Sequence, residues 1–305
     1  MPTGLGDEAP PRAPRGSEPL DAYRTPDRLK ARIAMHERFG NQAFDLHERI
    51  FELLLGPAAP FEGRGERRGE RRGEGLGEDP GEGLQEARVL EVGAGTGRMW
   101  RTVRARLPAG WNLTLTDRSE GMLAALRSLT AELDLNASVS HADAMELPFP
   151  DATFDLVFAN HMLYHVPEPA TAIREFRRVL RPGGVLVAAT NGEGHMRQAT
   201  ELIRPLAELG GGPELMGVSP LSFTSESGAV LLKTAFADVQ LHRFDDSLQV
   251  TDHQVLLAYL RSLVHLPDQV SAELSGALAA WERTVLAVPL PFLVGRATGV
   301  FLARA

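Results

Sequence analysis

The chain has 305 residues, 43% of them apolar and 24% charged, which is enough to bury the core of one large domain, with or without additions. Its net charge of -8 disfavours a protein whose main partner is the phosphate backbone of nucleic acid. Because it contains no cysteine, disulfides, thiolate metal sites and cysteine nucleophiles are excluded.

The N-terminal segment is rich in Pro, Gly and Glu and lacks the apolar region of a secretory signal, which predicts disorder over residues 1–20. Apolar runs elsewhere are too short to span a membrane. The best of them, Thr284 to Gly295, is interrupted by Pro289 and Pro291. We therefore expect a cytoplasmic protein without a membrane segment.

Two helices are predicted between Asp27 and Leu55, where apolar residues recur at partly helical spacing with a break near Gly40. They define an expected N-terminal helical cap over residues 21–62. Arg32 and His36 lie four positions apart and share a helix face, which we expect to be solvated.

Residues 63–83 are a low-complexity segment in which Gly-Glu-Arg-Arg is repeated, and this composition predicts a charged linker. An Arg-rich nucleic-acid patch is the alternative. The interleaved Glu residues and the absence of aromatic residues disfavour it.

Strand-like and helix-like segments alternate from Ala87 onward. Strands are predicted at 88–92, 111–116, 137–141, 154–159 and 185–189, and helices at 99–107, 121–133 and 170–180. The run from Arg181 to Gly184 is expected to end the last helix before the fifth strand begins. Buried strands separated by helices predict a doubly wound α/β sheet, in which ligands bind at the carboxyl ends of the strands.

Three glycines at alternate positions, Gly93, Gly95 and Gly97, follow the first strand and its acid Glu91. This pattern is typical of a nucleotide-cofactor loop, because glycine permits unusual backbone angles and close approach of a ligand; a purely structural turn is the alternative. A dinucleotide fingerprint has a further glycine where Arg98 stands. The loop therefore favours adenosine without a pyrophosphate.

Two acids follow the next two strands. Asp117 comes about twenty residues after the glycines, the spacing at which a carboxylate accepts hydrogen bonds from both ribose hydroxyls. Its alternative is a helix N-cap, a role that Ser119 can also fill. Asp143 is placed to accept a hydrogen bond from an adenine amine, with a simple loop turn as its alternative.

Five motifs in this order resemble class I S-adenosylmethionine-dependent methyltransferases, and most closely the small-molecule branch related to the ubiquinone and menaquinone biosynthesis enzymes. The motifs are Glu91 to Gly97, Asp117, Asp143 to Phe149, Phe154 to Asn160, and Leu180 to Gly184. The resemblance covers about residues 87–191.

The resemblance implies a seven-stranded Rossmann-like sheet with the last strand antiparallel. Its methyltransferase domain would span residues 84–305, with the sixth and seventh strands at 238–244 and 296–303. Helical insertions at about 195–235 and 250–290 would form a cap, with helical sequence at 195–209, 252–264 and 269–286.

The same resemblance assigns the cofactor site. The backbone around Glu91, Gly93, Ala94, Gly95 and Gly97 would hold the methionine moiety of S-adenosylmethionine, Asp117 its ribose, Asp143 with Ala144 its adenine, and Asn160 would face its methionine end. The implied reaction is in-line displacement at the sulfonium methyl, which needs a base only if the acceptor carries a proton.

Candidates for that base follow the fourth and fifth strands: His161, Tyr164 and His165, and then His195. Structural roles as loop caps or packing residues are the alternative for each histidine, and His161 is the best aimed. No Asp and His array supports a metal site, although His161 and His165 lie four apart.

The acceptor is expected to be a small, partly hydrophobic molecule. The cap region is apolar, although ordinary core packing explains any single one of its large residues: Met196, Met216, Phe223, Tyr259, Trp281 and Phe292. The Asn-Pro-Pro-Tyr motif of base-methylating enzymes is absent after the fourth strand, which disfavours nucleic acid as substrate. Two alternatives stay open, a non-catalytic relative that binds the cofactor or its product, and a Rossmann oxidoreductase.

Overall fold

The computed structural model describes residues 26–40, 45–56, 84–206, 221–264, 266–267 and 269–305. The expected disordered N-terminus (1–20) and the charged linker (63–83) lie outside these ranges.

The helices are α1 (Pro26–Phe39), α2 (Leu46–Leu55), α3 (Arg98–Val103), η3 (Arg104–Arg106), α4 (Glu120–Glu132), η4 (Leu163–His165), α5 (Pro169–Val179), α6 (Arg197–Glu201), α7 (Arg204–Leu206), α8 (Gly228–Leu232), α9 (His253–Leu263) and α10 (Ala272–Leu286). The strands are β1 (Glu86–Val92), β2 (Gly110–Asp117), β3 (Ala137–His141), β4 (Phe154–Asn160), β5 (Leu180–Asn191), β6 (Asp238–Val250) and β7 (Phe292–Arg304).

These strands form one seven-stranded sheet in the order β3-β2-β1-β4-β5-β7-β6. Strands β1 to β5 pair in parallel, whereas β7 is antiparallel to both of its neighbours. The predicted doubly wound sheet with an antiparallel last strand is confirmed. The order reverses at β1 and β4, so the carboxyl ends of these strands flank the switch point at which ligands bind in such sheets.

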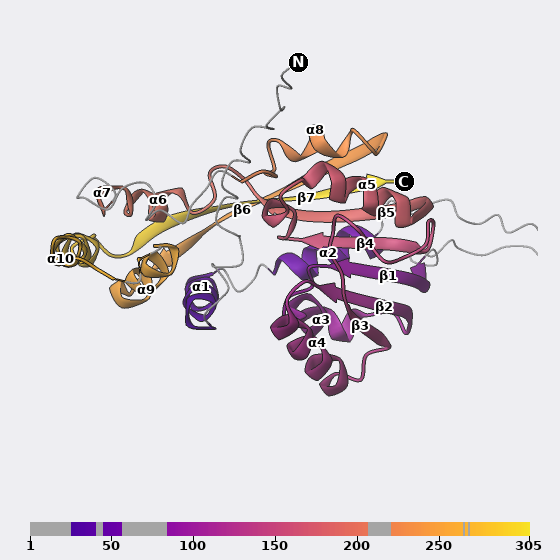
Figure 1. The fold of residues 1–305 in the computed structure, drawn as a ribbon, viewed down its shortest axis with the longest axis horizontal. Helices are drawn as coiled ribbons and strands as arrows, with labels where there is room; N and C mark the ends of the chain where they lie inside the picture. Colours follow the sequence, from indigo (N-terminus) through magenta and orange to yellow (C-terminus); the bar gives the residue numbers. More distant parts are fainter. Residues whose placement is uncertain (1–25, 41–44, 57–83, 207–220, 265, 268) are drawn as a thin grey trace, which may run out of the picture.

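Two hydrophobic clusters cover the two faces of the sheet, because successive side chains of a strand point to opposite sides. Val89 and Phe158 belong to the first cluster, together with α2, α3 and α4. Leu90 and Val157 belong to the second, together with α5 and α8. The core of the domain is therefore a three-layer arrangement of helices on both faces of the sheet (Figure 1).

Strands β6 and β7 are longer than predicted and project beyond the sheet. Strand β5 pairs with β7 only from Thr298 onward, whereas β6 pairs with β7 as far as its first residue, Phe292. Figure 1 shows this ribbon running from the sheet to α9 and α10. The predicted bounds 238–244 and 296–303 covered only the part nearer the sheet.

A third hydrophobic core, the cap cluster, surrounds the projecting ribbon. It consists of Met35, Met196, Ala199, Ile203, Leu206, Leu248, Val250, Leu256, Leu257, Tyr259, Leu260, Leu263, Val264, Trp281, Val285 and Val294. Helix α1 contributes to it through Met35. Helix α2 lies elsewhere, since its Phe51 packs on Trp111 with ring centroids 5.5 Å apart in the first sheet cluster. The two N-terminal helices thus serve different parts of the molecule.

Two expectations were wrong in detail. The run from Arg181 to Gly184 does not separate helix from strand, because β5 begins at Leu180, which pairs with Phe154 of β4. Phe223 is not a cap residue; it lies in the second sheet cluster, 5.6 Å from Phe301 between ring centroids. Met196, Tyr259 and Trp281 do belong to the cap cluster, Phe292 packs against it, and Met216 lies outside the described residues.

Among the described residues, no helix is both long and apolar enough to cross a membrane.

Candidate functional site

The three glycines of the turn after β1 all have left-handed backbone angles, with φ of +70° at Gly93, +58° at Gly95 and +76° at Gly97. Their surroundings differ. A Cβ at Gly93 would lie 2.8 Å from the Met162 side chain, and one at Gly97 would lie 2.3 Å from Leu129 of α4. A Cβ at Gly95 would meet no described atom within 4 Å. Gly95 is therefore the position at which the turn faces open space.

Asp117, the last residue of β2, is bound to this turn. Its Oδ2 accepts a hydrogen bond from the Gly95 amide at 2.9 Å, and its Oδ1 accepts one from the Ser119 amide at 2.9 Å. Ser119, rather than Asp117, is the N-cap of α4, with its hydroxyl accepting from the Met122 amide. Since each carboxylate oxygen has two lone pairs, Asp117 retains capacity to accept from ribose hydroxyls.

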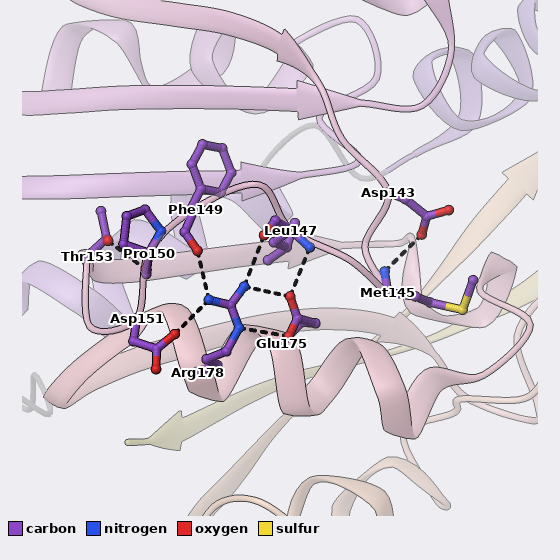
Figure 2. A network of polar contacts seen from close by, with 9 residues as sticks. All are labelled: Asp143, Met145, Leu147, Phe149, Pro150, Asp151, Thr153, Glu175 and Arg178. Carbon is purple, nitrogen blue, oxygen red and sulfur yellow. Dashed lines mark hydrogen bonds and ion pairs between the residues drawn. The ribbon is translucent and has the colours of Figure 1, made fainter.

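Asp143 follows β3 in a loop without a regular helix or strand. Its Oδ1 accepts a hydrogen bond from the Met145 amide at 2.8 Å (Figure 2). Its carbonyl oxygen accepts one from the Glu146 amide at 3.1 Å. The carboxylate is half-buried, and the neighbouring Ala144 is buried. The local turn predicted as the alternative is present, and it leaves the second carboxylate oxygen available to a ligand.

Glu91 is buried, with 3% of its surface exposed, and both of its oxygens are occupied by other side chains. Oε2 accepts from the Trp100 indole at 2.6 Å, and Oε1 accepts from the Asn160 amide at 3.1 Å. Burial raises the pKa of Glu91, and these two hydrogen bonds oppose that rise. Glu91 thus holds Asn160, whose Oδ1 is buried without a hydrogen-bond partner among the described residues.

The segment after β4 begins at His161, which has a left-handed φ of +53°, an uncommon conformation for a residue with a side chain. The ring of Tyr164 lies 6.3 Å from His161 and 4.5 Å from His165 between centroids. Burial, and then the neighbouring histidines, lower the pKa of His161 to about 3. Burial and then Arg32 lower the pKa of His165 to about 4. Both rings are therefore neutral at pH 7.

His195 follows β5 and has a fixed orientation. Its Nδ1 lies 3.0 Å from the carbonyl oxygen of Ala297. Because a carbonyl can only accept, Nδ1 carries the proton and Nε2 carries the lone pair in the neutral ring. Burial lowers the pKa of His195 to about 4, although the hydrogen bond to Ala297 opposes the shift.

The surroundings of Arg32 and His36 on α1 were misjudged from the sequence. His36 stacks on His195 with ring centroids 6.2 Å apart and meets Tyr259 edge-on at 6.3 Å. Arg32 donates through Nη2 to the Ser262 carbonyl of α9 at 3.0 Å. Their face of α1 is packed rather than solvated, and burial lowers the pKa of His36 to about 4. The four-residue spacing indicated that the two side chains share a face of α1, but it could not show that this face packs against α9.

The arrangement brings the predicted residues together in two groups. Asp117, Asn160 and the glycine turn are joined by hydrogen bonds or direct packing at the ends of β1, β2 and β4. After β4, the Tyr164 ring contacts the rings of His161 and His165, and after β5 the His195 ring stacks on His36 of α1. The group of Asp117, Asn160 and the glycine turn can thus bind a polar ligand. The second group offers neutral imidazoles near the cap cluster.

Residues 90–188 match the family model described as a methyltransferase domain. A demethylmenaquinone methyltransferase of Staphylococcus aureus is 38% identical over 100 residues, which are 33% of this chain and 41% of that protein. The chain thus spans about two fifths of the length of the curated relatives that it matches.

Two solved structures share the fold. A Bacillus halodurans protein for which a methyltransferase function has been suggested has a TM-score of 0.51 at 18% identity, over 72% of this chain and 93% of its own. The YcgJ protein of Bacillus subtilis has a TM-score of 0.50 at 16% identity, over 72% and 92%. With the family match, these findings confirm the resemblance to class I S-adenosylmethionine-dependent methyltransferases and the expected cofactor class.

Proposed function

We propose that the protein transfers the methyl group of S-adenosylmethionine to a small, partly hydrophobic acceptor held between the carboxyl edge of the sheet and the cap cluster. The observation that supports this best concerns the surroundings of Gly95. Gly95 is the turn glycine that faces open space, and its amide is held by Asp117, so a ligand can approach the main chain there.

The polar groups around Gly95 suit the parts of this cofactor. Asp117 would accept hydrogen bonds from the ribose hydroxyls, and Asp143 beside Ala144 would accept one from the adenine amine. The Oδ1 of Asn160, which has no hydrogen-bond partner in the part of the chain that the structure describes, would accept from the methionine ammonium, with Glu91 holding the amide in place. When bound, S-adenosylmethionine supplies an electrophilic methyl group on a sulfonium that leaves as a neutral thioether.

The chain's own contribution to the reaction would be alignment, exclusion of water and acceptance of a proton. We propose His195 as the base if the acceptor loses a proton, because the carbonyl of Ala297 fixes its tautomer and leaves Nε2 as acceptor. His161 is the alternative base, and burial lowers its pKa to about 3. Tyr164 and His165 would then orient the acceptor.

The acceptor class follows from the cap. Its cluster is apolar apart from the Tyr259 hydroxyl and the Trp281 indole N–H, which favours a ring or chain with little charge. The Staphylococcus aureus relative is named for demethylmenaquinone, so a short-chain demethylmenaquinol belongs in the panel of acceptors to be tested. Phenols, amines and thiols of similar size complete that panel.

Calorimetry with S-adenosylhomocysteine tests the cofactor site. We expect binding to the wild type, and a loss of at least about tenfold in affinity for Asp117→Ala, because two hydrogen bonds to a charged acceptor are removed. Glu120→Ala removes an exposed acid three residues later and is the matched control. Binding of a nicotinamide dinucleotide instead would establish the oxidoreductase alternative.

Turnover on the acceptor panel tests the catalytic assignment. His195→Asn keeps a donor near the Ala297 carbonyl but loses the basic nitrogen, so kcat should fall about a hundredfold with little change in the KM for the cofactor. His161→Asn should have the smaller effect, and the reverse order would remove His195 as the base. A wild type that binds S-adenosylhomocysteine but turns over no acceptor would favour a non-catalytic relative.

A further inference from the structure

The loop between β3 and β4, residues 142–153, carries Asp143 and is bound by two side chains of α5, Arg178 and Glu175 (Figure 2). Arg178 projects from the last turn of that helix toward the loop. Its guanidinium has five N–H donors in a fixed planar fork, and hydrogen bonds engage every nitrogen.

The acceptors of Arg178 are of two kinds. Nη2 donates to the Leu147 carbonyl at 3.0 Å, and Nη1 donates to the Phe149 carbonyl at 2.7 Å. Nε and Nη2 also donate to the two carboxylate oxygens of Glu175, at 2.8 and 2.7 Å, and Nη1 to Asp151 at 2.8 Å. The hydrogen bond from Arg178 is the main cause of the lowered pKa of Glu175.

Glu175 closes the arrangement, because its Oε2 also accepts a hydrogen bond from the Leu147 amide at 2.9 Å. Both backbone groups of Leu147 are therefore held by the Arg178–Glu175 pair. Leu147 follows the turn in which Asp143 bonds the amides of Met145 and Glu146. Leu147 is therefore fixed on one side of this turn, and on the other side the Ala142 amide donates to the Asp117 carbonyl at 3.3 Å.

Arg178 and Glu175 can hold the loop in a fixed position because α5, which carries both, is packed in the hydrophobic core. The buried face of this helix, which includes Ile173, Phe176 and Val179, is 0% exposed within the second sheet cluster. A loop without helix or strand has few backbone bonds of its own and takes its position from such contacts.

We propose that Arg178 and Glu175 are positioning residues for the adenine subsite: they fix the β3–β4 loop so that the Asp143 carboxylate meets an exocyclic amine and rejects a base without one. This inference rests on the proposed function, in which Asp143 receives the adenine amine. The two residues act through the loop and do not touch the ligand.

The test compares two ligands by calorimetry. S-inosylhomocysteine differs from S-adenosylhomocysteine in carrying a carbonyl oxygen where adenine carries its amine, so it presents an acceptor to Asp143. We expect the wild type to prefer S-adenosylhomocysteine by about tenfold or more. In Arg178→Met the preference should shrink to within about threefold. A general loss of stability would weaken both ligands alike and would leave this ratio unchanged.

Four further variants sharpen the test. Arg174→Met, one turn earlier on α5, removes an exposed Arg that donates to the Thr171 hydroxyl, and should keep the wild-type ratio. Asp143→Ala should lose the preference, and the double variant Asp143→Ala with Arg178→Met should lose no more, because both act on one contact. Arg178→Lys keeps the charge without the planar fork and should also lose the preference.

If Arg178→Met folds and still prefers S-adenosylhomocysteine as strongly as the wild type does, the inference is wrong. If Arg178→Met does not fold, the same comparison is made with Arg178→Lys. A wild type that binds neither ligand would overturn the proposed function itself. A wild type that binds both equally would leave the cofactor site standing and would overturn the role of Asp143, and of the pair behind it.

Discussion

The glycine turn and the cap cluster are built in opposite ways. The turn is made from residues close together in the chain, and its Asp117 is 22 residues from the amide of Gly95 that it binds. The cap cluster joins α1 to α9 through contacts such as that between Arg32 and Ser262, which are 230 residues apart. One region is fixed by local backbone geometry, and the other by the docking of distant segments.

The two regions also have separate hydrophobic cores. The turn is supported by the sheet clusters, whereas α1, α9 and α10 bury their side chains on the projecting ribbon of β6 and β7. Damage to the cap should therefore impair acceptor binding and turnover while cofactor binding persists. Damage to the turn should impair cofactor binding, and turnover with it, while the cap cluster stays intact.

The largest expected effect is in the cap. Trp281 is fully buried there, and its indole donates to the Leu202 carbonyl at 2.6 Å. Trp281→Ala should lower the free energy of unfolding by about 3–5 kcal/mol, through lost burial and an unpaired carbonyl. Denaturant unfolding measures this change. Affinity for S-adenosylhomocysteine should stay within about threefold of the wild type, and a parallel loss of that affinity would show that the two regions are not separate.

A milder pair of variants addresses the turn. Gly97→Ala adds a Cβ 2.3 Å from Leu129 at a left-handed φ, which should lower the free energy of unfolding by about 2–4 kcal/mol. Gly95→Ala meets no described atom, so only the backbone penalty of about 1–2 kcal/mol is expected. Its affinity for S-adenosylhomocysteine should nevertheless fall at least about tenfold, because the new methyl group occupies space that the ligand needs.

Chemical denaturation and calorimetry on both variants separate these roles. If Gly97→Ala lost affinity but kept its stability, or Gly95→Ala kept its affinity, the assignment of the open position in the turn would be wrong.

This contrast also explains what the sequence could predict. The sheet, the glycine turn and the acids at the ends of β2 and β3 depend on short-range patterns, and the structure places them as expected. Their roles toward a ligand stay predictions. The packing of His36 was missed because helical spacing reveals that residues share a face, but not which element that face will meet.

Arg178 was overlooked for a related reason. The sequence placed it in a predicted helix, but two of its acceptors are backbone carbonyls of a loop about thirty residues earlier, and any residue supplies a carbonyl. The projecting ribbon was underestimated too, because the stretch from Asp245 to Val250 alternates polar and apolar residues only weakly. Long-range partners of this kind leave no periodic signal.

The effect that is smallest for a single step of one pH unit concerns the histidines at the boundary of the two regions. Burial lowers the pKa of His36, His165 and His195 to about 4 and that of His161 to about 3. The unfolded chain takes up these protons near pH 6.5, but the folded protein resists them until about pH 4. Between these values the unfolded state binds more protons, so stability should fall as the pH is lowered from 6.5 to 4.

His36→Gln removes one of these groups and should reduce that slope. For His36, burial is the main cause of the shift, followed by His195, Arg296 and Arg98, and Asp246 opposes them. One proton corresponds to at most about 1.4 kcal/mol per pH unit, so urea unfolding at several pH values can resolve the difference. An unchanged slope would mean that His36 is solvated, and that α1 does not close over His195. The cap would then lack the His36–His195 contact, which joins α1 to the segment after β5.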